Sequence, residues 1–227
     1  HVYPLDFAAA LWNSLETEPE KHLEQYISRY YGDRSLKEMK ECFMEYFEAA
    51  LPYGEKEDEH AGEQFYNYVT RVLIHQWMKD GGKAACEELL WCGPAESFAG
   101  QLQWYVSKCK NAYPRFQRLL DRCGSLADEL PEDCCRLWKD SLLLQVKIHT
   151  FCLEGVIHFG KGYSAYGSSD YLNAFYEIGQ AADHFHLAEE AMKECGHDKW
   201  KGFYDNDCQT DIKETVYLLR LLMGYIR

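Results

Sequence analysis

Residues 134–159, which read CCRLWKDSLLLQVKIHTFCLEGVIHF, decide the fold class of this chain of 227 residues. Apolar side chains recur along this stretch at steps of three and four residues, the period of one face of an α-helix. The stripe consists of Leu137, Trp138, Leu142, Leu144, Ile148, Phe151, Cys152 and Val156. A stripe of this width and length predicts a long helix that buries one face in a core.

The same period appears in most of the remaining sequence. Long helices are predicted at 35–50, 59–78 and 212–226. Shorter or less regular helical patterns lie at about 4–13, 19–31, 97–121 and 169–195. Pro114 is expected to kink or interrupt one of these helices, because proline has no backbone N–H to donate. The sequence therefore predicts an all-α fold, in which residues 1–227 form a single domain. We expect a bundle of about eight long and mostly antiparallel helices.

The charge of the chain is strongly acidic. It contains 24 Lys and Arg against 37 Asp and Glu, which gives a formal net charge of −13. Such a surface repels phosphate groups and anionic lipids, so binding to nucleic acid or to a membrane surface is not expected. No run of about 18 apolar residues occurs, so no membrane-spanning helix is predicted. Aromatic residues make up 15% of the chain, a composition that suits contact surfaces between proteins.

The ten cysteines are interpreted mainly as free thiols. Cys134 and Cys135 are neighbours, which is awkward for a disulfide framework, and no Cys-x-x-Cys pair suggests a zinc ribbon or a redox motif. Cys42, Cys109 and Cys152 lie inside helical patterns as small apolar residues. Free thiols favour a reducing cytoplasmic setting or an anaerobic one. A disulfide-stapled secreted domain is the alternative.

Histidine and carboxylate spacings give weak support for a metal site. Residues 57–60 and 194–197 both read Glu-x-x-His, the pair used by di-iron helical bundles. One copy falls in an acidic loop and the other ends at a glycine, so both are interpreted as solvated helix ends. His184 and His186 are about 200° apart on a helix and are not expected to share a metal. His149 and His158 are nine residues apart, too far for one site.

Motifs for covalent catalysis and phosphate binding are also missing. The sequence contains no Gly-x-Ser-x-Gly, no glycine-rich phosphate loop and no His-Glu-x-x-His. No catalytic residue, cofactor or metal ligand is therefore assigned from the sequence.

The most unusual local composition is the stretch 199–207, KWKGFYDND. Aromatic faces beside carboxylates are what sugar recognition uses, since rings stack on the apolar face of a sugar and carboxylates accept from its hydroxyls. The candidate contact residues for a ligand or a neighbouring domain are Trp200, Phe203, Tyr204, Asp205 and Asp207. The alternative is a packed connector whose aromatic side chains close the end of the bundle.

Short motifs along most of the chain resemble glycoside hydrolase family 115, the xylan α-glucuronidases. Residues 3–13 (YPLDFAAALWN) are similar to the peptide that leaves the family's catalytic barrel, and residues 26–32 (YISRYYG) to the end of its next helix. The helix at 134–159, after Leu130-Pro131, corresponds in place to the family's long central helix. Residues 196–200 (GHDKW) resemble the Gly-Lys-Trp that closes its last regular helix.

This resemblance implies an accessory helical domain of a larger glycan-processing protein. Residues 1–13 would lead in from a preceding catalytic domain, which the helices would buttress. The domain would also help to shape the substrate cleft or form a homodimer contact. The family's catalytic carboxylates lie in the barrel and match no position here, so the isolated chain is not expected to be catalytic. After Lys199-Trp200 the sequence departs from the family, whose continuation leads to a C-terminal β-domain. The implied partners are the neighbouring catalytic domain and carbohydrate.

Other interpretations stay open. The helical region that follows the barrel in family 84 hexosaminidases is comparable. A free-standing helical metal-binding protein or enzyme is a second class of function, for which Glu-x-x-His is the only cue. A third is a helical adaptor that binds peptides in a groove.

Overall fold

The computed structural model describes residues 2–13, 17–51, 63–94, 96–195, 201–202 and 211–226. This part of the chain is 84% helical and contains no strand, which confirms the all-α prediction. The α-helices are α1 (Val2–Asn13), α2 (Pro19–Tyr31), α3 (Leu36–Ala49), α4 (Glu63–Asp80), α5 (Phe98–Glu129), α6 (Glu132–Trp138), α7 (Leu144–Gly167), α8 (Tyr171–Glu194) and α9 (Ile212–Ile226). A short 3-10 turn, η1 (Glu87–Leu89), follows α4.

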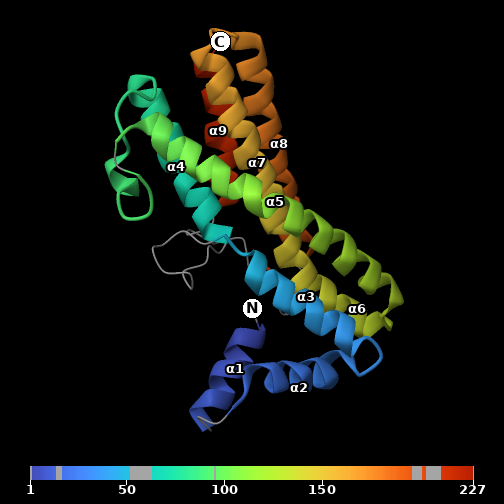
Figure 1. The fold of residues 1–227 in the computed structure, drawn as a ribbon. Coiled ribbons are helices and arrows are strands. Elements are labelled where there is room, and N and C mark those ends of the chain that lie inside the picture. Colours follow the sequence, from blue (N-terminus) through green and yellow to red (C-terminus); the bar gives the residue numbers. More distant parts are fainter. Residues whose placement is uncertain are drawn as a thin grey trace.

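The stretch that decides the fold class forms the central helix. A π-helical segment, η2 (Lys139–Leu143), joins α6 to α7, so that Glu132–Gly167 is one continuous helix of 36 residues. In Figure 1, α7 runs beside α8, and α8 in turn packs on α9, whereas α5 crosses α7 and α4 approaches from the side. At the other end of the molecule α2 and α3 lead away to α1. The core is one connected cluster of apolar side chains that draws on helices from α2 to α9.

Pro114 does not end α5, which continues from Phe98 to Glu129. Proline removes one backbone donor and disfavours the helix interior. The apolar face of α5 continues on both sides of the proline, however, with Cys109 and Phe116 fully buried. Burial of that long face holds the helix together across the missing hydrogen bond, so of the two expected effects of Pro114, a kink or an interruption, the interruption does not occur.

The central helix is also the one described segment that is long and apolar enough to cross a membrane. Its most apolar segment of 18 residues has a mean hydropathy of 1.2, and 72% of that segment is buried inside the molecule. A core helix of a soluble protein passes the same test of length and composition.

The nine cysteines of the described ranges are free thiols. Cys42, Cys109 and Cys152 are fully buried, which confirms their interpretation as small apolar core residues. Burial raises the pKa of the Cys86 and Cys92 thiols to about 11, so both are uncharged at neutral pH. Cys208 lies outside the described residues.

Glycines allow α7 and α8 to approach closely. A Cβ atom added at Gly155 would lie 2.7 Å from the ring of Phe185 and 3.3 Å from the carbonyl oxygen of Ala181. About two turns further on, a Cβ atom at Gly162 would lie 2.6 Å from the Ile178 side chain. These contacts fix the distance between the two helices and therefore the positions of every side chain between them.

A pair of glycine substitutions tests this contact. We expect Gly155→Ala to lower the free energy of unfolding by about 1–3 kcal/mol, because the buried Phe185 ring and the α8 backbone leave no room for a methyl group. Gly124→Ala in α5 is the control, since nothing lies within 4 Å of its added Cβ. The control should gain up to about 1 kcal/mol from its better helix propensity. Urea unfolding measures the free energy of unfolding of both variants. A Gly155→Ala variant more stable than the unaltered chain would contradict close packing of α7 on α8.

Candidate functional site

The residues singled out from sequence lie outside the part of the chain that the structure describes. This holds for Trp200, Phe203, Tyr204, Asp205 and Asp207, and for one or both members of each Glu-x-x-His pair. Their role as a ligand or domain contact stays a prediction.

The first feature is α1, which is held in place by its one charged residue. Asp6 accepts a hydrogen bond from His22 Nε2 of α2 at 2.9 Å and lies 3.7 Å from the guanidinium of Arg29. Phe7 packs on the same imidazole, with a ring-centroid distance of 5.4 Å. These contacts fix α1 against α2 at the edge of the molecule (Figure 1).

The opposite face of α1 is apolar and open to solvent. Ala8 and Ala9 are exposed, and the side chain of Trp12 is 92% exposed at the end of the helix. Apart from Asp6, the twelve residues of α1 carry no charge. We call Ala8, Ala9 and Trp12 the α1 face. An ordered apolar face of this kind typically marks a contact with another protein surface.

A second exposed surface lies where α8 begins and α9 ends. The Tyr166 ring packs on Tyr171 at 5.6 Å, and its hydroxyl hydrogen-bonds with Tyr225. Other exposed apolar side chains on these two helices are Leu172, Phe175, Tyr176, Tyr217 and Leu221. In Figure 1 this end of α7, α8 and α9 is far from α1, so the two surfaces are separate.

A third feature is a cluster of two histidines and two glutamates between α7 and α8. His158 Nδ1 lies 2.6 Å from Glu177 Oε2, and His184 Nδ1 lies 3.4 Å from Glu154 Oε2. The two imidazoles stack with their centroids 5.2 Å apart and their planes at 11°. We call Glu154, His158, Glu177 and His184 the Glu–His cluster. Its side chains are only 14–29% exposed.

The electrostatics of this cluster are set by partial burial. Desolvation lowers the pKa of His184, and the neighbouring His158 adds to the decrease, against the opposing effect of Glu154. Tyr113 of α5 hydrogen-bonds with Glu154. Burial first, and then this carboxylate, raise the pKa of Tyr113 to about 12, so its hydroxyl keeps its proton.

Sequence reasoning missed this arrangement. It compared His158 with His149 and His184 with His186, because those pairs are close in sequence. His186 indeed points away from the cluster, toward Glu189 and Glu190 of its own helix. The one local signal was the spacing of Glu154 and His158, which places both side chains on the same face of a helix.

The remaining described histidine of α7, His149, is fully buried in the core. Its Nδ1 lies 3.0 Å from the hydroxyl of Tyr66 and its Nε2 lies 3.3 Å from that of Tyr46. The ring stacks on Phe116 at 4.8 Å. Burial lowers the pKa of His149 to about 3, so the imidazole is neutral and structural at physiological pH.

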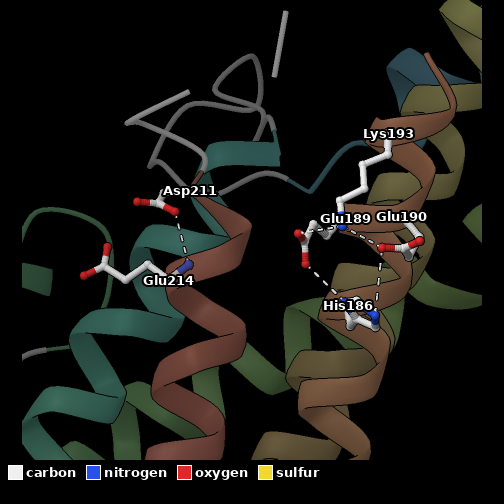
Figure 2. A network of polar contacts seen from close by, with 6 residues as sticks. All are labelled: His186, Glu189, Glu190, Lys193, Asp211 and Glu214. Carbon is white, nitrogen blue, oxygen red and sulfur yellow. Dashed lines mark hydrogen bonds and ion pairs between the residues drawn. The ribbon is translucent and has the colours of Figure 1, made fainter. Parts of the chain in front are cut away.

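Surface ion pairs complete the polar features of α8 and α9. Figure 2 shows Lys193 bound to both Glu189 and Glu190, with His186 on the other side of the same carboxylates. In the same view Asp211 accepts from the backbone N–H of Glu214 and caps the start of α9. Exposed pairs of this type stabilise helices by a few tenths of a kcal/mol each, about 0.2–0.5. We assign them no further role.

In comparisons with protein-family models, with curated proteins and with solved structures, the chain matches none of them. Proposals about its function therefore rest on its own residues and their geometry.

Proposed function

We propose that this chain is a non-catalytic helical domain that packs against a neighbouring catalytic domain of the same polypeptide. The α1 face carries this proposal. The glycan-processing character of the catalytic partner, and a contact with its substrate, rest on the resemblance to glycoside hydrolase family 115 alone.

The α1 face combines two properties that favour docking. It is ordered by the contacts of Asp6 with α2, so it presents a fixed shape rather than a loose end. It also leaves the large indole of Trp12 almost fully exposed. Burial of apolar surface is worth about 25 cal/mol per Å² removed from water, so covering this face is favourable. Tryptophan is also among the residues most often found at the energetic centre of interfaces.

The carboxylates of one described groove are not arranged as in a glycosidase. A groove of about 490 Å³ between α3 and α5 contains three glutamates, Glu41, Glu45 and Glu48. All three are on α3 and form ion pairs with Arg115 or Arg122 of α5. A glycosidase needs two carboxyl groups on opposite sides of the bond that it cleaves. Paired glutamates on one wall do not meet this requirement.

A binding experiment tests the proposed docking. The chain and the catalytic domain encoded by the same gene are expressed separately and titrated by calorimetry. We expect Trp12→Ala to weaken binding by at least about tenfold, since truncating an interface anchor typically costs more than 1 kcal/mol. Trp91→Ala is the matched control, because Trp91 is 57% exposed and follows the 3-10 turn η1, in a different part of the chain from α1.

Two results would contradict the proposal. One is a gene that encodes no further domain beside this chain. The other is equal affinity for the Trp12→Ala variant and the unaltered chain. Far-ultraviolet circular dichroism of each variant checks that the helices are intact.

A further inference from the structure

We propose that Glu154, His158 and His184 bind a divalent transition-metal ion that cross-links α7 and α8, with Glu177 and Tyr113 orienting two of the ligands. This metal site goes beyond the proposed docking and is independent of it. Its ligands come from the inner faces of two helices, whereas docking involves α1.

The three ligand side chains already converge. One donor atom from each of Glu154, His158 and His184 lies within 4.8 Å of the donor atoms of the other two. Bonds of about 2.1 Å in a tetrahedral site place ligand atoms roughly 3.4 Å apart, so the donor atoms would have to approach one another by up to about 1.4 Å to enclose an ion. The close contact of Gly155 with α8 fixes the backbones on both sides of the site.

The surroundings of the ligands match those of known metal sites. A histidine that binds a metal usually donates its other ring N–H to a carboxylate. Glu177 is placed to accept from His158 Nδ1 at 2.6 Å, which leaves the lone pair on Nε2. Tyr113 donates in the same way to Glu154. Each orienting group therefore fixes one ligand from outside the site.

The hydrogen bonds within the Glu–His cluster leave one nitrogen atom of His184 without a partner. Its Nδ1 atom is buried and has no hydrogen-bond partner among the described residues, since the nearest carboxylate oxygen is 3.4 Å away in a poor direction. An imidazole nitrogen without a hydrogen-bond partner is available as a metal ligand.

The donor set selects the class of ion. Two imidazoles and one carboxylate suit zinc and other divalent first-row transition metals, whereas Ca²⁺ and Mg²⁺ prefer oxygen ligands throughout. Three protein ligands leave a coordination position for water, and the partial exposure of the cluster gives water access to it. The bound ion would hold α7 and α8 together at the middle of their contact.

Cobalt binding tests this proposal on the full chain under reducing conditions. We expect one Co²⁺ per chain, with visible ligand-field absorption, displacement by Zn²⁺, and no sulfur-to-cobalt charge-transfer band. His158→Gln and His184→Gln should each abolish this binding. Glu177→Gln should weaken it about 10- to 100-fold, as expected for a group that orients a ligand.

His186→Gln provides the matched control. It removes a histidine from the same helix that also lies beside two glutamates, but outside the cluster (Figure 2). This variant should bind cobalt as the unaltered chain does. Circular dichroism confirms that each variant is folded. The proposal is overturned if no cobalt binds at millimolar concentration, if His184→Gln binds as before, or if a thiolate band shows that cysteines hold the ion.

Discussion

Replacing Trp138 with alanine is expected to lower the free energy of unfolding by about 3–5 kcal/mol. The indole is fully buried, and its ring packs edge-on against Tyr31 at 5.7 Å and Phe43 at 5.8 Å. Its Nε1–H also donates to the carbonyl oxygen of Cys123 at 2.9 Å, so the variant loses a hydrogen bond as well as the packed ring. Chemical denaturation followed by circular dichroism measures the loss.

Trp12→Ala is the control for this prediction. Trp12 is exposed in the isolated chain, so its removal should change the free energy of unfolding by no more than about 0.5 kcal/mol. Equal effects of the two substitutions would contradict the assignment of Trp138 to the core.

Acid is expected to destabilise the protein through His149. The pKa of this buried imidazole is about 3 in the folded chain, against about 6.5 for an unfolded histidine. Between these values the unfolded state binds one more proton, so stability falls as the pH falls, by up to about 1.4 kcal/mol per pH unit. From pH 7 to pH 4 the contribution of His149 amounts to about 3 kcal/mol.

Comparison with His149→Gln isolates this contribution from those of the carboxylates. Glutamine cannot titrate but can still hydrogen-bond with Tyr46 and Tyr66. We therefore expect the difference in unfolding free energy between the two proteins to be constant above pH 7 and to shrink as the pH falls toward 4. A difference that does not depend on pH would show that His149 is not buried as a neutral ring.

The fold was predictable because its main determinant is local. The apolar stripe from Leu137 to Val156 predicts its helix directly. The same spacing of apolar residues, at steps of three and four, predicts most other helices. The continuation of α5 through Pro114 was not predictable, because it is not a local property. The effect of the proline depends on how much surface the whole of α5 buries, and α5 continues beyond the predicted stretch 97–121 to Glu129. At this position, burial of the helix face outweighs the intrinsic preference of proline against a helix interior.

The Glu–His cluster was not predictable from spacing. Glu154 and His158 come from α7, but His184 and Glu177 reach them only because α7 and α8 turn back on one another in the right register. That register depends on contacts such as Gly155 against Phe185, which have no signature in a single sequence. The candidate residues from Trp200 to Asp207 lie outside the described ranges, so the prediction made for them stays as it was.

The accessibility of Trp12 in the complete polypeptide tests the central claim of docking most directly. Hydroxyl-radical footprinting, read by mass spectrometry, measures the oxidation of each tryptophan. In the isolated chain Trp12 and Trp91 are both exposed and should both react quickly. In the complete polypeptide we expect Trp12 to be protected and Trp91 to remain reactive. Equal oxidation of Trp12 in the isolated chain and in the complete polypeptide would contradict the proposal that a neighbouring domain covers the α1 face.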